Sequence, residues 1–325
     1  MTLLNTFHDS GLLKPSWDTE MMPIVKQTAG TILLAIVSSF MAVSHAQPLA
    51  PGNTATSFSL TGINQFSTGL DQGGNFNWYE ADARLRMTRQ FSSEWAAGFS
   101  VGYGYDRWFW NDAKAFGGQA PWNSISTPSI GLSFQYTPQP GLTFMFNPSV
   151  EWAGEDGVGT AGSSIYGAVL AASNRFNKDL TLGLGVGVFR ELGETKAFPY
   201  LVVNWKITDK LTLRNPLPAG PAGGAGLELA YAIDNQWSVG VGGAYRKYRF
   251  RLNDSGPYAG GVGQNRMIPI FARVSYAFTP STALDFYASA VTGGIVQVQS
   301  ADESRSKSVG YNTGLGLALN LSHRF

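Results

Sequence analysis

The chain ends in the sequence SVGYNTGLGLALNLSHRF, residues 308–325, and this stretch gives the clearest indication of the fold. Counted in steps of two from Tyr311, one set of positions is mainly apolar: Tyr311, Thr313, Leu315, Leu317, Leu319, Leu321, His323 and Phe325. The positions between them are mostly small or polar: Asn312, Gly314, Gly316, Ala318, Asn320, Ser322 and Arg324. Because alternate side chains of a strand point to opposite faces, the pattern predicts a strand with one apolar face. Such a strand is longer than the usual length of about five or six residues and could cross a membrane at a tilt.

An aromatic carboxyl-terminal residue that follows alternating apolar positions resembles the closing strand of bacterial outer-membrane β-barrels. The resemblance implies that Phe325, together with His323, Leu321 and Leu319, forms the signal that the barrel-assembly machinery reads. It also implies periplasmic chaperones as partners during biogenesis, and outer-membrane lipid and lipopolysaccharide as the surroundings of the finished protein. The oligomeric state stays open.

The composition of the 325-residue chain excludes several classes of protein. Charged residues make up 14% of the chain, compared with roughly 25% in soluble domains. The formal net charge of +1 gives no broad attraction to nucleic acid. Cysteine is absent, which excludes a disulfide framework, thiolate metal ligands, a cysteine nucleophile and a lipoprotein anchor. We expect neither a cofactor nor a metal.

The amino-terminal part of the chain predicts a secretory signal peptide at residues 21–46. It has a positive charge at Lys26, a mainly apolar run at 31–43 and small residues just before the cleavage site. This apolar run is too short to span a bilayer, so a transmembrane helix is the weaker interpretation. An exported barrel of a Gram-negative bacterium belongs in the outer membrane.

The signal peptide also sets the expected domain boundaries. Translation would begin at Met21 or Met22, which makes residues 1–20 an upstream extension. The mature chain would begin near Gln47, with a short periplasmic segment at 47–56 and the barrel at 57–325.

Six tight connections repeat one layout, in which an aromatic residue or Ile precedes polar turn residues and Leu or Trp follows them. They lie at 91–95, 136–142, 176–180, 207–211, 233–237 and 278–284. Longer Gly-, Asn- and Pro-rich connections are expected near 69–76, 111–126, 154–163, 193–196, 215–224, 254–264 and 299–307. Alternating short and long connections are typical of transmembrane barrels. The count predicts an all-β, antiparallel up-and-down β-barrel of about fourteen strands, with twelve to sixteen possible, and both ends in the periplasm.

The segments between these connections alternate in polarity. For example, Leu182, Leu184, Val186 and Val188 alternate with glycines, which predicts a strand with one lipid-facing side. One segment is irregular, because Tyr248 and Phe250 are out of phase with Val239 and Val241; a β-bulge near Gly242–Gly243 would explain the slip. A soluble β-sandwich also alternates, but its strands are shorter.

The opposite set of positions carries charges that would be costly in contact with lipid, so we expect them to line the lumen. They are Glu80, Asp82, Arg84, Arg86, Glu151, Lys206, Glu228, Arg273 and Asp285, with Asp106 and Arg214 in the same class. Fourteen tilted strands give a backbone cylinder about 28 Å wide. No loop is long enough to form an obvious plug. The charges could orient polar solutes, or they could form a self-neutralising network without a role in transport.

Catalysis is not expected. The resemblance to outer-membrane barrels implies a histidine in the catalytic set of any barrel enzyme. Phospholipases, lipid A-modifying enzymes and omptin-type proteases all use one. Only His323 stays in the predicted mature chain, and the alternation places it outward beside Phe325. Glu80 and Asp82 share a face, but a network of lumen charges explains them better than acid–base chemistry. The glycine-rich run 183–187 matches no phosphate-binding loop, and the basic stretch 246–251 is expected to line the barrel mouth or meet anionic lipid headgroups.

The repeated turns and alternating strands are similar to those of poorly characterised porin-like barrel families of Gram-negative bacteria. We therefore expect a passive channel or transporter for small solutes, with a polar lumen of mixed charge. The alternative is a structural or surface-interaction barrel whose lumen is closed and transports nothing.

Overall fold

The computed structural model describes residues 49–215, 225–302 and 304–325, and these residues form a closed antiparallel β-barrel. The predicted extension and signal peptide at 1–46 lie outside the described residues. The barrel closes where the first strand pairs with the last, with Leu60 opposite Leu321. Three of the wall strands are interrupted, so the seventeen strand segments correspond to the fourteen strands that the sequence predicts.

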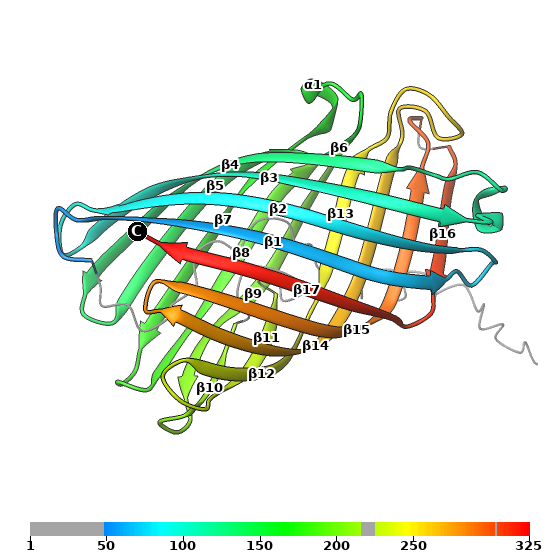
Figure 1. The fold of residues 1–325 in the computed structure, drawn as a ribbon. Coiled ribbons are helices and arrows are strands. Elements are labelled where there is room, and N and C mark those ends of the chain that lie inside the picture. Colours follow the sequence, from blue (N-terminus) through cyan, green and yellow to red (C-terminus); the bar gives the residue numbers. More distant parts are fainter. Residues whose placement is uncertain (1–48, 216–224, 303) are drawn as a thin grey trace, which may run out of the picture. The chain divides into compact units, whose positions relative to one another are not determined.

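The strands follow one another around the wall in chain order (Figure 1). They are β1 (Thr54–Gly69), β2 (Asn75–Gln90), β3 (Trp95–Asn111), β4 (Ser124–Gln139), β5 (Leu142–Trp152) continued by β6 (Gly154–Glu155), β7 (Ser164–Arg175), β8 (Leu180–Glu191), β9 (Glu194–Lys206), β10 (Leu211–Arg214), β11 (Gly226–Ala232), β12 (Trp237–Ala244) continued by β13 (Arg246–Arg251), β14 (Val262–Thr279), β15 (Thr282–Gln299), and β16 (Ser306–Tyr311) continued by β17 (Gly314–Arg324). A 3₁₀ turn at Lys114–Phe116 and α1 (Thr160–Ser163) are the helical elements of the described residues. No described helix is long and apolar enough to span a membrane.

The six predicted tight connections all lie at one end of the barrel, which we call the turn end. The first residues of β1 and the last residues of β17 lie at the same end. Turn chemistry explains them. In the turn between β11 and β12, for example, the Asp234 carboxylate accepts the backbone N–H groups of Gln236 and Trp237 at 2.8 and 2.7 Å. The opposite end, the loop end, holds the longer connections. The prediction of a long connection near 193–196 was wrong, because β8 and β9 are joined by the two-residue turn Leu192-Gly193.

The outer surface is apolar, as the alternation predicts. Leu315, Leu317, Leu319 and Leu321 of β17 are exposed, while the residues between them face inward. Aromatic residues gather near the turn end, where Trp95 stacks on Tyr136 with ring centroids 4.4 Å apart. Large apolar side chains outside a closed wall are stable only in contact with lipid, so this surface is that of a membrane barrel.

Three neighbouring strands change side-chain phase at one level of the described wall. The change occurs near Phe66 in β1, at Gly293 in β15, and between β16 and β17. Gly293 has a φ of 60°, which a residue with a side chain rarely adopts, and the β14–β15 register shifts there. The phase change corrects the prediction for the closing stretch, because Tyr311 is buried inside instead of joining the outer leucines.

The bulge predicted near Gly242–Gly243 was also wrong. The pairing with β14 runs without a register shift from Trp237 to Arg251. Tyr248 and Phe250 are therefore true inward residues, and the alternation failed as a guide because the interior is aromatic at this level.

Candidate functional site: the lumen

The structure places the charged residues that the sequence assigns to the lumen on the inward side of their strands, at several levels. Lys206 is the one nearest the turn end, where it forms an ion pair of 2.9 Å with the fully exposed Asp209. The others come from β2, β5, β11, β14 and β15: Glu80, Asp82, Arg84, Arg86, Glu151, Glu228, Arg273 and Asp285. They divide into a buried group and a group in contact with lumen water.

The buried group is centred on Arg273, which lies between two carboxylates. Its Nη2 is 2.6 Å from Glu228 Oε1, and its Nη1 is 3.2 Å from Asp285 Oδ1. Arg214 also contacts Glu228, at 3.2 Å, and Asn320 donates to Asp285 at 3.1 Å. Two cations thus balance two anions in a largely buried network, which links side chains of β10, β11, β14, β15 and β17.

The second group follows β2, and its ion pair between Asp82 and Arg84 is open to water. Arg84 Nη2 lies 3.5 Å from Asp82 Oδ2, and these side chains are 22% and 20% exposed although they face the interior. Glu80 lies directly opposite Asp106 of β3, and it accepts a hydrogen bond of 3.2 Å from the Tyr248 hydroxyl. The exposure of an inward ion pair shows that side chains do not fill the lumen at the level of Arg84.

An aromatic core fills the loop end of the interior. Trp78 stacks on Trp108 with ring centroids 5.3 Å apart, and Trp122 meets Trp108 edge-on at 5.3 Å. The Trp78 indole donates to Gln65 at 2.9 Å. Most rings of this core are almost completely buried and only Trp110 and Tyr248 are partly buried, which makes it a packed interior. Its ring members are Phe76, Trp78, Trp108, Trp110, Phe116, Trp122, Tyr248, Phe250 and Tyr311.

The sequence argument missed this core, although a signal was present. It found no loop long enough for a plug, but strand side chains fill the space instead. Trp78 and Phe76 are in the same phase of β2 as Glu80 and Asp82, so the inward face visibly turns from charged to aromatic toward the loop end.

The strand β13 closes the core on one side by crossing to the far wall. Arg251 of β13 pairs in parallel with Gly154 of β6, and the Arg251 N–H donates to the Ala153 carbonyl at 3.0 Å. Around the wall, β7–β11 separate these two strands on one side, and β14–β17 with β1–β4 separate them on the other. This contact makes a smaller ring at the loop end, with the aromatic core inside it.

A carboxylate fastens the crossing strand. Glu155 of β6 accepts the backbone N–H of Asn123 at 3.2 Å with one oxygen and that of Asn253 at 3.1 Å with the other. Since Asn253 follows β13 directly, Glu155 ties the end of this strand to the connection between β3 and β4.

The predicted basic stretch 246–251 is therefore this crossing strand, and its two faces differ. Arg246, Tyr248 and Phe250 face the smaller ring. Lys247 and Arg249 face the hairpin of β8 and β9, where glutamates pair with them. Contact with lipid headgroups was thus the wrong alternative for Lys247 and Arg249.

The histidine of the described residues lies on the outer surface. His323 lies outside, with its Nδ1 2.8 Å from Thr282 Oγ1 and its ring 4.5 Å from that of Phe325. No group of His, Cys, Asp and Glu side chains within the described ranges could hold a metal ion. The glycines at 183–187 serve packing, because a side chain at Gly185 or Gly187 would collide with the ring of Tyr200 or Phe198.

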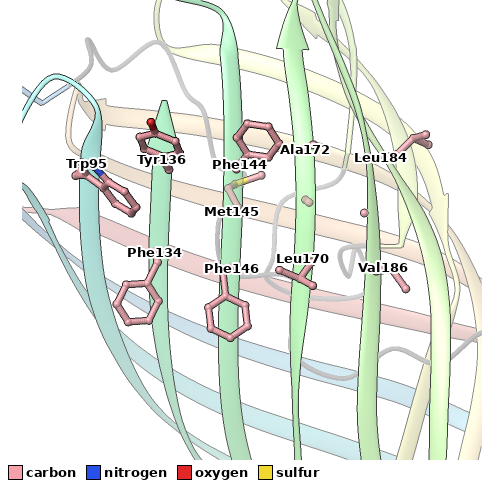
Figure 2. A pocket seen from close by; sticks show the side chains of 12 residues that line it. Trp95, Phe134, Tyr136, Phe144, Met145, Phe146, Leu170, Ala172, Leu184 and Val186 are labelled. Atoms are coloured by element: carbon pink, nitrogen blue, oxygen red, sulfur yellow. The ribbon is translucent and has the colours of Figure 1, made fainter. Parts of the chain in front are cut away.

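An apolar groove of about 820 Å³ lies on the other side of the wall, away from the lumen. Its side chains come from β4, β5, β7 and β8 and from the start of β3, with the small Ala172 among larger residues (Figure 2). The rings of Phe144 and Phe146 and the side chain of Leu184 are exposed there, so the groove belongs to the membrane-facing surface.

Comparisons with known proteins add no assignment. A family described as "Domain of unknown function (DUF6268)" matches residues 162–305, less than half of the chain. Among curated proteins, no sequence matches.

The chain is similar to several solved structures. An outer membrane channel from Pseudomonas putida F1 has 10% identity and a TM-score of 0.46, over 86% of this chain and 97% of the channel. The KdgM porin has 10% identity and a TM-score of 0.36, over 83% and 99%. The toluene transporter TodX from P. putida has 11% identity and a TM-score of 0.41, over 85% and 91%. Likeness at this level carries no argument about solutes, and the strand pairing establishes the barrel by itself.

Proposed function

We propose that this protein is a passive outer-membrane channel for small polar solutes. The observation that supports the proposal is the Asp82–Arg84 pair, whose side chains face the interior of a closed barrel and are about one-fifth exposed. Charged side chains on an interior wall need water or a partner, so water enters the turn half of the lumen. The apolar outer surface meanwhile places the wall in a bilayer.

One observation favours the alternative of a closed, non-transporting barrel. The aromatic core and β13 occupy the loop end, so the lumen narrows there. The two functions differ in a single property, which is whether ions and small solutes ever pass this end.

Electrical recording separates the two functions. Purified protein in a planar bilayer should give discrete conductance steps. Liposomes that contain the protein should swell as a small sugar passes through it. Boiled protein, which has lost the barrel, is the matched control. Silence in both assays, from protein whose gel mobility still changes on boiling, would contradict the channel and support the closed barrel.

The route to the outer membrane is a second part of the proposal. Residues 21–46 act as a signal peptide that is removed on export, and the mature chain begins near Gln47. Amino-terminal sequencing of the exported protein tests this. Recovery of residues 1–20 on the mature protein would contradict it.

A further inference from the structure

The hairpin of β8 and β9 rests with its tip against β13. Its two-residue turn has Leu192 at a φ of 44° and Gly193 at a φ of 100°. This turn suits the twist of a hairpin, but positive φ is unfavourable for a leucine. Leu192 is partly buried and packs against the larger hydrophobic cluster to which the aromatic core belongs. The leucine therefore acts as an apolar anchor for the hairpin tip.

Ion pairs lie on both sides of this anchor. Lys247 Nζ is 3.5 Å from Glu191 Oε2, and the two side chains are 3% and 1% exposed. Arg249 Nη2 is 3.4 Å from Glu194 Oε1. The other carboxylate oxygen of Glu194 is 2.6 Å from Lys196 Nζ. We call the contact formed by Lys247, Arg249, Glu191, Glu194 and Leu192 the seam. Lys247 and Glu191 are both buried, so removal of either leaves a buried charge without its partner, and loss of Arg249 or Glu194 removes the second ion pair across the seam.

The hairpin contacts β13 across the seam through the side chains of two ion pairs. The smaller ring on the opposite face of β13 is closed by backbone pairing and filled with aromatic rings. Of the two faces of β13, the one at the seam is therefore the one that can part at the lower cost in free energy.

From these contacts we infer that the seam is the gate of the channel. Seating of the β8–β9 hairpin on β13 closes the loop end, and solutes pass between the two when the hairpin moves away. This inference rests on the proposed channel function and adds the residues that control it. The parted seam has a basic side on β13 and an acidic side on the hairpin, so the ion selectivity of an opening reports which charges line it.

Two double variants test the gate with opposite readouts. Glu191→Gln with Glu194→Gln leaves the basic side of the seam, and Lys247→Gln with Arg249→Gln leaves the acidic side. In planar bilayers under a KCl gradient, both should raise the open probability about tenfold or more over the wild type. The first should open with a preference for anions and the second with a preference for cations.

Two further variants complete the design. Exchange of the charges, with Lys247→Glu, Arg249→Glu, Glu191→Lys and Glu194→Lys together, should return the open probability toward that of the wild type. The control removes the exposed loop pair of Asp112 and Lys114, which are 2.8 Å apart, by Asp112→Asn with Lys114→Gln. It should behave as the wild type. Heat-modifiable gel mobility confirms that each variant is a folded barrel.

The outcomes separate the gate from the channel function itself. If neither the wild type nor any folded variant conducts, the channel function is wrong and the gate with it. If the wild type conducts and the two double variants match the control, the channel stands and the gate is wrong. Openings of equal selectivity in the two double variants would also overturn the gate, because ions would then not pass between these charges.

Discussion

The two halves of the lumen are built from the same fourteen strands but differ in what fills them. In the turn half, Arg84 and Asp82 face the interior and keep contact with water. In the loop half, the same phase of β2 carries Trp78 and Phe76, which are completely buried. Strand number alone therefore does not decide whether a barrel is open, because one strand crossing the interior can turn part of a pore into a packed core.

The largest effect is expected from the aromatic core. Trp108→Ala removes a ring that contacts Phe76, Trp78 and Trp122, and should lower the free energy of unfolding by about 3–5 kcal/mol. Its neighbour Phe109 is 44% exposed on the outer face, so Phe109→Ala is the matched control and should cost clearly less. Urea titration with refolding into lipid vesicles measures both. Equal losses would mean that the loop half is not a packed core.

The turn half contains its own contrast between a buried and an open arginine. Arg273→Met leaves Glu228 and Asp285 without their main partner and should cost about 3–5 kcal/mol of unfolding free energy. Arg84→Met should cost no more than about 1 kcal/mol, because its ion pair is partly in water. The effects on ion selectivity should have the reverse order, because Arg84→Met should change the selectivity of the channel more than Arg273→Met. A stability loss at Arg84 equal to that at Arg273 would contradict a water-filled turn half.

A smaller effect on stability is expected at the hairpin tip. Leu192→Gly removes the anchor, which lowers stability, but it also relieves about 1–2 kcal/mol of unfavourable φ. The unfolding free energy should therefore change little, while the open probability in bilayers rises. A large loss of stability without a change in opening would indicate that Leu192 only packs.

The smallest effect is expected at the tight turns. The backbone N–H groups of Trp237 and Gln236 lower the pKa of Asp234 below its usual value of 3.8. A carboxyl group with a lowered pKa stabilises the fold above its unfolded pKa, and this contribution is lost as the pH falls through the folded pKa. Asp234→Asn should therefore slightly reduce stability at pH 7 and have no effect well below pH 3. An equal effect at both pH values would show that the charge is irrelevant.

Sequence reasoning recovers the wall of this barrel better than its contents. Turn residues such as Asp234 locate the tight connections. The two-residue period correctly predicts the outer residues of the closing strand, which are Leu315, Leu317, Leu319 and Leu321. Tyr311 was misplaced because the phase changes between β16 and β17, which no local pattern announces.

The partners of β13 were beyond the sequence for a different reason. Gly154 and Glu191 are distant in the chain from Arg251 and Lys247, and they meet only because β13 leaves the wall. Alternation shows that the side chains of Lys247 and Tyr248 point to opposite faces of the strand, but it assigns one of those faces to lipid. Only the three-dimensional structure shows that both faces lie against protein.

Thiol accessibility tests the difference between the two halves most directly, because the chain contains no cysteine of its own. Arg84→Cys in the turn half and Val309→Cys in the loop half both face the interior, and Val309 is 1% exposed. With a charged, membrane-impermeant thiol reagent added to folded protein in vesicles, Arg84→Cys should react rapidly and Val309→Cys should stay unmodified. Equal reaction at the two positions, or protection of Arg84→Cys, would contradict a lumen that is wet in one half and packed in the other.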